Sequence, residues 1–327
     1  MRARVYITQP VAASAIERLR AVADVEHNPE ALHTPSKDEL VAAVRNHDVL
    51  WCLLQDRIDA EVIAANPHLR LLATMKITPS DIDVAAATSR RIPVTVIPPM
   101  VTEATADLHF GLMLAVARRI VEGDRMLRAG VFPGAQSMHF EGAYVCGKTI
   151  GLVGGGGRIG CAVARRARGF GMRLLYWGPR RMAESDEQGL AMEYVPLDTL
   201  LAESDFVSLH PPLKPETQHL IGAREIALMK PTAFLINTAR GPIVDEAALA
   251  QALVQRRIAG AGLDVYEHEP NVHPDLLPLT NVVLTPHLGS AVASLREQMA
   301  HIVVDNITAV LEGRRPPNCW NPEIYAS

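Results

Sequence analysis

Four consecutive glycines, Gly154 to Gly157, stand between the apolar run Thr149 to Val153 and a helix-like sequence that starts near Arg158. Three of the glycines in this region have the G-x-G-x-x-G spacing that permits a tight strand-to-helix turn and a close backbone approach to a pyrophosphate. The free N–H groups at the helix start would bind that anion. Glycines also serve plain turns, but the flanking strand and helix favour a dinucleotide site. The expected cofactor-binding residues here are Gly155, Gly157, Arg158, Ile159 and Gly160.

Composition describes an ordinary protein with small-molecule partners. The chain has 327 residues, which favours two domains, and 48% hydrophobic residues with a net charge of −4, which offers no basic field for nucleic acid. Its four cysteines lack C-x-x-C spacing, so we expect neither a metal site nor a disulfide framework and infer a reduced, cytoplasmic setting. No signal peptide and no membrane-spanning stretch is predicted.

Short β-rich runs alternate with helical patterns, which predicts an α/β protein with two Rossmann-like, doubly wound parallel sheets. We expect a substrate domain at residues 1–100, completed by 288–327, and a dinucleotide-binding domain at 101–287. An apolar helix is predicted from Thr102 to Ala117. Its apolar residues lie on several faces, so it should be buried, either between the domains or in a subunit interface. The expected strands are Val5–Thr8, Val49–Leu53, Leu69–Thr74, Pro93–Ile97, Thr149–Val153, Arg173–Trp177, Phe206–His210, Ala233–Asn237, Gly260–Val265 and Asn281–Thr285.

Polar residues end the strands of the predicted second sheet. His210, the segment Asn237 to Arg240, Asp264 and His287 all follow apolar runs. Ligands of open α/β sheets bind beyond the carboxyl ends of the strands, so these residues should lie together at one edge. Each of them alone could instead cap a neighbouring loop.

Three motifs in this region resemble the NAD(P)-dependent D-2-hydroxyacid dehydrogenase family. They are Asn237-Thr-Ala-Arg240-Gly-Pro, Gly262-Leu-Asp264-Val-Tyr-Glu-His-Glu269-Pro and Thr285-Pro-His287-Leu-Gly-Ser. The resemblance runs from Asp56 to the helix at Ala291. Within the family, it is strongest for the glyoxylate or hydroxypyruvate reductase group. The resemblance implies two domains with the active site in the cleft between them, and a homodimer.

The resemblance also implies that Arg240, Glu269 and His287 form the catalytic set. Arg240 can grip the carboxylate and carbonyl oxygens of a 2-oxo acid through paired hydrogen bonds. His287 would donate a proton to the carbonyl oxygen as hydride arrives from the nicotinamide. Glu269 would orient the imidazole and favour its protonated form. Glu269 could instead be a solvated loop acid like Glu267.

The end of the second strand bears on the choice of cofactor. An acid about 20 residues after the glycines would bind the ribose of NAD, but Gly178 stands there, after Trp177 and before Arg180 and Arg181. Two guanidinium groups would accommodate the 2′-phosphate, so NADP(H) is preferred and NAD(H) is the alternative. The arginines could also form only a solvated turn. The resemblance adds further cofactor-binding residues: Thr105, His210, Pro211, Pro212, Thr238, Ala239, Asp264 and Gly289, with Arg240 and His287 themselves.

Two departures from the family pattern concern the glycine turn and the substrate loop. The turn has one extra glycine. The loop that commonly reads V-G-Y-D-N-I-D appears as Ile77-Thr78-Pro79-Ser-Asp-Ile-Asp83, so Thr78 replaces a glycine whose N–H helps to hold the substrate carboxylate. Lys76 could meet a second negative group, or could be an ordinary surface lysine. The expected substrate-binding residues are Lys76, Ile77, Thr78, Arg240 and His287.

We therefore expect NADPH-dependent reduction of a small 2-oxo acid, of the glyoxylate, hydroxypyruvate or 2-ketogluconate type, to the D-2-hydroxy acid. One alternative is a dehydrogenase of a phosphonate, a sulfonate, phosphite or another doubly charged acid. Phosphite dehydrogenases of the same family place their lysine at the position of Ile77, which weakens the phosphite alternative. The other is a dinucleotide-sensing binding protein, similar to the corepressors of the family. Retention of Arg240, Glu269 and His287 argues against a sensor.

Overall fold

The computed structural model describes residues 2–53 and 55–326, and the chain divides into two compact units. The first unit comprises Met1–Met100 and Ala291–Ser327, and the second comprises Val101–Ser290. The second unit therefore extends to Ser290, beyond the predicted end at His287. Each unit is a parallel sheet flanked by helices, as the alternation of strands and helices predicted.

The first unit contains a five-stranded parallel sheet in the order β2-β1-β3-β4-β5. This is the flavodoxin-like order, in which β1 lies between β2 and β3. The C-terminal segment runs beside β5, because Val96 N donates to Asn318 O at 3.1 Å and Trp320 N donates to Val94 O at 2.8 Å. The strands are β1 (Arg4–Ile7), β2 (Asp24–His27), β3 (Val49–Cys52), β4 (Leu71–Thr74) and β5 (Val94–Thr95).

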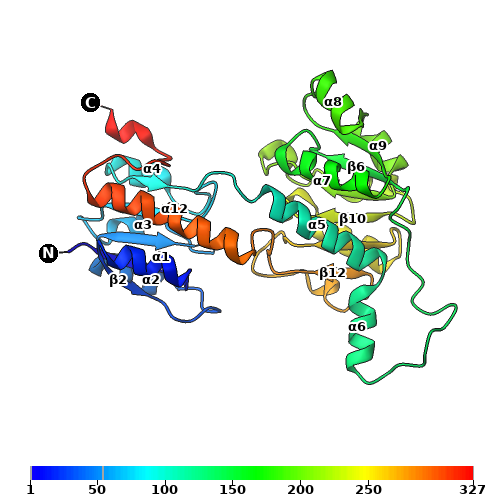
Figure 1. The fold of residues 1–327 in the computed structure, drawn as a ribbon, viewed down its shortest axis with the longest axis horizontal. Helices are drawn as coiled ribbons and strands as arrows, with labels where there is room; N and C mark the ends of the chain where they lie inside the picture. The colour runs from blue at the N-terminus through cyan, green and yellow to red at the C-terminus, as the bar shows by residue number, and fades with distance from the viewer. Residues whose placement is uncertain (1, 54, 327) are drawn as a thin grey trace. The chain divides into compact units, whose positions relative to one another are not determined.

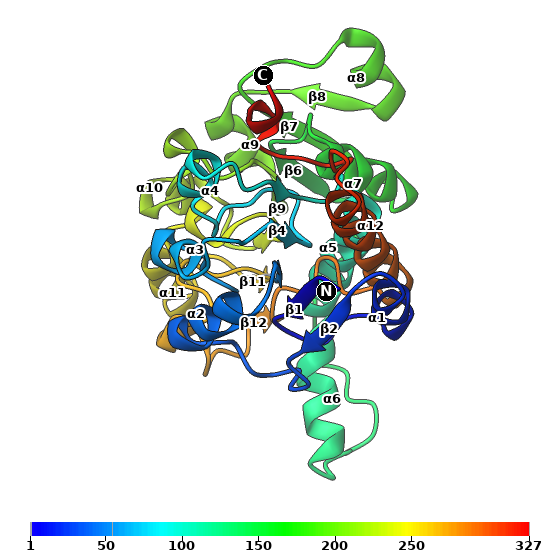
Figure 2. The same ribbon diagram turned by 90° about the vertical axis from the view of Figure 1, so that its left-hand side faces the viewer.

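Two helix layers cover this sheet. In Figure 2, α1 and α12 lie together on one side of the strands, and α2, α3 and α4 lie on the other. A capping box starts α2, since Ser36 Oγ accepts from Glu39 N and Glu39 Oε2 accepts from Ser36 N. The helices are α1 (Ala13–Arg20), α2 (Lys37–Asn46), α3 (Ala60–Ala64), α4 (Val84–Ser89), α12 (Ala293–Leu311) and the short η4 (Pro322–Tyr325).

The second unit contains a seven-stranded parallel sheet in the order β12-β11-β10-β9-β6-β7-β8. The strand order reverses between β6 and β9, which is the topological switch point of a Rossmann sheet. Ligands of such sheets bind beyond the carboxyl ends of the strands at this point. The strands are β6 (Thr149–Val153), β7 (Arg173–Trp177), β8 (Met192–Tyr194), β9 (Phe206–Leu209), β10 (Phe234–Asn237), β11 (Gly260–Leu263) and β12 (Val282–Leu284).

Helices pack on both faces of the second sheet (Figure 1). On one face α5 contacts α7, β10, β11 and β12, and on the other α9, α10 and α11 form a layer. Helix α6 and the segment after it extend away from these layers. The helices are α5 (Thr102–Ala117), α6 (Ile120–Arg128), α7 (Arg158–Gly169), α8 (Glu184–Leu190), α9 (Leu197–Glu203), α10 (Ala223–Leu228) and α11 (Glu246–Val254), with η1 (Pro215–Thr217), η2 (Gly241–Ile243) and η3 (Pro274–Leu276).

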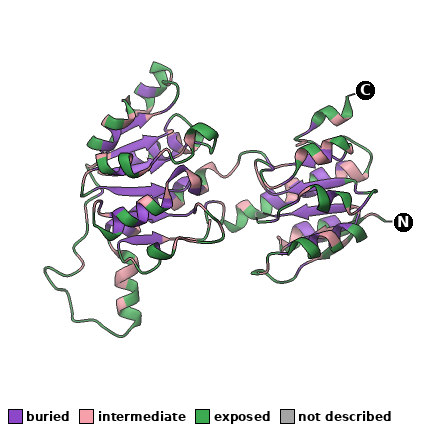
Figure 3. Ribbon diagram, turned by 180° about the vertical axis from the view of Figure 1, so that it is seen from behind, coloured by how far each residue is buried: buried purple, intermediate pink, exposed green. Residues whose placement is uncertain are grey.

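Helix α5 has the bounds that the sequence predicted, but its apolar residues pack within its own unit. Ala106, Phe110 and Met113 belong to the core cluster that α5 shares with α7 and the sheet. The central strands of both sheets are buried in their units, while the outer helix surfaces are exposed (Figure 3). Burial of α5 therefore needs neither a domain interface nor a subunit interface.

The predicted strands omitted β2 and β8. Both are edge strands, and their sequences Asp24-Val-Glu-His and Met192-Glu-Tyr contain no apolar run. An edge strand pairs with a neighbouring strand on only one side and tolerates charged residues, so an apolar run does not reveal β2 or β8. No helix in residues 2–53 and 55–326 is long and apolar enough to cross a membrane.

Candidate active site

The glycine turn joins β6 to α7 at the switch point of the second sheet. Gly154 has a φ of +78°, and its N–H donates to Trp177 O at 2.7 Å. A Cβ on Gly154 would lie 2.7 Å from Pro211 N, so a side chain cannot fit between this turn and the segment after β9. The turn therefore brings the predicted cofactor residues Trp177 and Pro211 beside the glycines.

The N-terminus of α7 lies directly after this turn. Gly157 is the N-cap residue, and no side chain caps the helix, so the first backbone N–H groups of α7 can bind an anion. Gly155 and Gly160 are buried, whereas Gly156, Gly157 and Arg158 are exposed. Ile159 packs against the core cluster of α5 and α7. This arrangement fits the pyrophosphate of a dinucleotide.

An ion pair between Glu269 and His287 lies beyond the carboxyl ends of β11 and β12. Glu269 Oε2 and His287 Nδ1 are 2.9 Å apart, and Tyr266 N donates to Glu269 Oε1 at 3.1 Å. Burial raises the pKa of Glu269, but the hydrogen bond and charge of His287 outweigh it and leave the pKa below its ordinary value. Within the described residues, His287 Nε2 has no hydrogen-bond partner. This nitrogen can therefore exchange a proton with a ligand.

Asp264 holds the backbone of the segment that carries His287. Its carboxylate accepts from Thr285 Oγ1 at 2.6 Å, Leu288 N at 2.7 Å and Gly289 N at 2.9 Å. His287 itself has a φ of +54°, and its N–H donates to Asp264 O at 3.0 Å. Burial raises the pKa of Asp264 in spite of these hydrogen bonds. Asp264 thus fixes the loop from inside the protein.

Arg240 is placed near Glu269 by a close backbone contact. A Cβ on Gly241 would lie 1.8 Å from Tyr266 O, so only glycine allows the two segments to touch. Arg240 is exposed, yet nearby protein atoms remove part of the water around its guanidinium and lower its pKa, which the charge of Glu269 opposes. Buried Asn237 shapes the turn, because its side chain accepts from Ala239 N and donates to Arg240 O. The structure brings Arg240, Glu269 and His287 together at one sheet edge.

Comparison with known proteins gives the family of the chain. Residues 110–289 match the profile of the family described as D-isomer specific 2-hydroxyacid dehydrogenase, NAD binding domain. The chain is also 44% identical over 333 residues to a glyoxylate reductase of Thermococcus litoralis, covering 100% of this chain and 99% of that protein. The chain belongs to the D-isomer specific 2-hydroxyacid dehydrogenase family. It is therefore an NAD(P)-dependent oxidoreductase.

Solved structures show the same fold. A crystal structure of a Thermus thermophilus protein matches this dehydrogenase with a TM-score of 0.88 at 42% identity, covering 97% of this chain and 99% of that one. The NADPH-dependent glyoxylate/hydroxypyruvate reductase of Sinorhizobium meliloti, solved with NADP and malonate, matches with a TM-score of 0.76 at 31% identity. That match covers 98% of this chain and 97% of the other. The two predicted Rossmann-like domains are thereby confirmed.

The remaining predicted cofactor residues of the dehydrogenase lie at the same edge of the second sheet. Thr105 Oγ1 donates to Gly289 O at 3.2 Å, which links α5 to the His287 segment. Thr238 and Ala239 are buried after β10, and within the described chain Thr238 Oγ1 has no hydrogen-bond partner. Pro212 is exposed after β9. The unpartnered hydroxyl of Thr238 is an observation that favours a ligand at this edge.

The sequence prediction missed a buried histidine on α5. His109 is fully buried, and Ser208 Oγ lies 3.2 Å from His109 Nε2 and also contacts His210 Nε2. Burial lowers the pKa of His210 to about 3, and burial next to His210 lowers that of His109 well below its ordinary value. Both imidazole rings are neutral, so His109 and Ser208 can hold the predicted cofactor residue His210 in place without burying a charge. The sequence feature that could have revealed His109 is a single histidine within an otherwise apolar helix.

The two predicted phosphate-binding arginines have different surroundings. Arg181 Nε and Nη2 donate to Glu187 at 2.9 Å and 2.8 Å. Arg180 is exposed and forms no hydrogen bond or ion pair with another residue of the described chain. Gly178 O accepts from Tyr194 OH at 3.1 Å, so the turn before the arginines is also held.

The predicted substrate loop lies in the first unit, after β4. Lys76 N donates to Thr74 Oγ1 at 3.2 Å, and the Lys76 side chain forms an ion pair with Asp81. Ile77 is half-buried and Thr78 is exposed. Lys76 is therefore a paired lysine rather than an ordinary surface lysine, which the sequence had left open.

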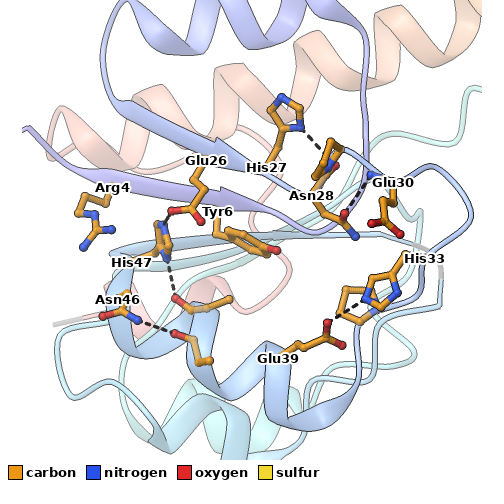
Figure 4. A pocket seen from close by; sticks show the side chains of 14 residues that line it. Arg4, Tyr6, Glu26, His27, Asn28, Glu30, His33, Glu39, Asn46 and His47 are labelled. Carbon is orange, nitrogen blue, oxygen red and sulfur yellow. Dashed lines mark hydrogen bonds and ion pairs between the residues drawn. The ribbon is translucent and has the colours of Figure 1, made fainter.

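A pocket of about 500 Å³ in the first unit contains none of the predicted site residues (Figure 4). Its polar walls pair with one another: His47 Nε2 lies 3.2 Å from Glu26 Oε2, and His33 Nε2 lies 3.0 Å from Glu39 Oε1. His47 Nδ1 also donates to the carbonyl oxygen of Ala43 at 2.7 Å. The predicted site residues of the second unit lie at the edge of the second sheet instead.

Proposed function

We propose that the chain reduces a small 2-oxo acid to the D-2-hydroxy acid with NADPH, the leading substrates being glyoxylate, hydroxypyruvate and 2-ketogluconate. The observation that carries the proposal is the Glu269–His287 ion pair with Arg240 beside it at the cofactor edge of the sheet. The relative from Thermococcus litoralis is a glyoxylate reductase, and the relative from Sinorhizobium meliloti is an NADPH-dependent glyoxylate/hydroxypyruvate reductase.

Each residue of the set has a distinct role in the proposed reaction. The nicotinamide ring supplies the hydride when the cofactor is bound. Arg240 binds the carboxylate and carbonyl oxygens of the substrate and polarises the carbonyl bond. His287 donates its Nε2 proton to the carbonyl oxygen, and Glu269 holds the opposite nitrogen of the ring. The same histidine accepts the proton in the reverse direction.

NADP(H) is the proposed cofactor, and NAD(H) is the alternative. The turn at Gly154 and the uncapped start of α7 would hold the pyrophosphate. Arg180 and Arg181 follow β7, where an acidic residue would favour NAD, and their positive charges would attract a 2′-phosphate.

A singly charged acid is the proposed substrate class. Lys76, Ile77 and Thr78 are proposed to bind it together with Arg240 and His287. Asp81 offsets the charge of Lys76, and a second negative group on the substrate would need that charge. The ion pair therefore argues against the phosphonate, sulfonate or phosphite alternative. The complete Arg240, Glu269 and His287 set argues against a sensor without catalysis.

The test combines a substrate panel with a histidine variant. We expect NADPH oxidation at 340 nm with glyoxylate or hydroxypyruvate, faster than with NADH. His287→Gln should lower kcat by about 10² to 10⁴-fold, because a proton donor in the transition state typically contributes that much. His219, paired with Glu267, is a matched control, and His219→Gln should keep its kcat. Near-normal turnover in His287→Gln would refute the acid/base role. Activity on dianionic acids alone would support the alternative substrate class.

A further inference from the structure

Three interactions fix the loop between β7 and α8, which carries Arg180 and Arg181. Tyr176 is fully buried at the end of β7, and its hydroxyl accepts from Met182 N at 2.8 Å and donates to Glu187. Tyr194 OH donates to Gly178 O at 3.1 Å. Hydrogen bonds within the protein therefore hold the loop at both ends.

Glu187 gives Arg181 a fixed orientation. The carboxylate accepts two hydrogen bonds from the guanidinium, at 2.9 Å from Nε and 2.8 Å from Nη2, which is the bidentate geometry that orients arginine most strongly. The Glu187 side chain is 7% exposed, whereas that of Arg181 is 65% exposed. Arg181 and Tyr176 together lower the pKa of Glu187 to about 2, so the carboxylate stays ionised. The remaining guanidinium N–H groups can bind a second acceptor.

The fixed arginine borders the glycine turn. A Cβ on Gly156 would lie 3.1 Å from Met182 Cγ, so the residue next to Arg181 lies against the turn that fits the pyrophosphate. In Rossmann sheets the ribose of the adenosine half is recognised at the end of this second strand. Arg181 is thus held where a 2′-phosphate would bind. Arg180 adds a positive charge that forms no ion pair with another described residue.

We infer that Glu187 is a positioning residue that sets the selectivity for NADPH over NADH by holding Arg181 ready for the 2′-phosphate. The inference rests on the proposed use of NADPH. Ordering one long side chain in advance removes an entropic cost of binding, which corresponds to a factor of about three to ten in affinity. Glu187 also offsets one positive charge, which opposes phosphate binding, so position and charge must be separated by experiment.

Two substitutions at Glu187 separate the effect of side-chain position from the effect of charge. Glu187→Asp keeps the charge but is too short for the bidentate pair, and Glu187→Gln removes the charge. The readouts are the ratio of kcat/KM for NADPH to that for NADH, and calorimetric binding of adenosine 2′,5′-bisphosphate against adenosine 5′-monophosphate. Both variants should lower the preference for the 2′-phosphate about three- to tenfold. Neither should lower it further when Arg181→Ala is already present.

The controls make the outcomes distinct. Asp186→Asn removes an equal charge from the same exposed helix and should leave the ratio unchanged, and thermal melting verifies that each variant folds. A higher ratio in Glu187→Gln, or an unchanged ratio in Glu187→Asp, would overturn the inference. A wild-type protein without preference for the 2′-phosphate fragment would instead overturn the proposed use of NADPH.

Discussion

At the scale of single residues, Gly154 carries a constraint that Gly156 does not share. Gly154 combines a φ of +78° with a backbone atom of Pro211 only 2.7 Å from where a Cβ would stand, whereas Gly156 has only the flexible Met182 side chain at 3.1 Å. Gly154→Ala should therefore disrupt the turn and weaken cofactor binding at least tenfold, while Gly156→Ala should bind nearly as wild type. Fluorescence titration with NADPH measures both. Equal losses in the two variants would contradict this assignment.

The Arg181–Glu187 pair predicts a pH-dependent stability. The pKa of Glu187 is lowered from 4.5 to about 2, so its stabilisation is present above about 4.5 and is lost as the pH falls towards about 2. The difference in melting temperature between wild type and Glu187→Gln should be largest at pH 7 and should shrink below pH 4.5. The exposed Glu216 is a control, because Glu216→Gln should show no such trend. A difference that persists unchanged at pH 3 would refute the ionised pair.

At the scale of elements, the loop after β12 depends on one buried carboxylate. Asparagine at position 264 has a single acceptor oxygen, and its amide nitrogen would face a backbone N–H donor. Asp264→Asn should cost about 1–3 kcal/mol in the free energy of unfolding and should lower kcat, because the His287 loop is displaced. Chemical denaturation and initial rates measure the two effects. Asp275→Asn, at an exposed position of η3, should change neither. A loss of stability without a loss of kcat would show that Asp264 does not position His287 for catalysis.

At the scale of the whole molecule, we propose that a homodimer uses the exposed apolar side chains of α6 and of the segment after it. No residue of α6 is buried in the described chain, and Leu127, Phe132, Met138 and Tyr144 are exposed, Met138 to 82%. Large exposed apolar patches mark association surfaces, and these side chains are among the exposed apolar ones of α6 and of the segment after it. On this proposal, wild-type protein should have the mass of a dimer in light scattering after size exclusion, and Leu127→Asp with Phe132→Asp should lower it to that of a monomer. Leu32→Asp, at another exposed leucine, should leave the mass unchanged. A dimer that persists in the double variant must use a different surface. A wild-type tetramer would require a second interface in addition to this one.

Local sequence pattern was sufficient to predict the central strands of both sheets and to locate the motifs of the candidate site. Val49 to Cys52 and Phe234 to Ile236 are continuous apolar runs because both faces of a parallel sheet are covered, so hydrophobicity alone revealed these strands. The edge strands β2 and β8 lack that burial and were missed. The resemblance of three motifs to a known family implied the roles of Arg240, Glu269 and His287, and their residue types suit the proposed chemistry.

By itself, the sequence determined the two α/β units and the glycine turn, because these depend on local periodicity and short motifs. The proposed catalytic set came from the resemblance of the sequence to a known family. Only the tertiary structure decided which polar groups pair. The pair of His109 with Ser208 joins positions 99 residues apart in the chain. The pairs of Glu187 with Arg181 and of Lys76 with Asp81 join positions only six and five residues apart, but the orientation of their side chains depends on the surrounding fold. Hydrophobic periodicity carries no information about such polar contacts. The same reason explains why Asp264, predicted as a cofactor contact, is also the anchor of the His287 loop.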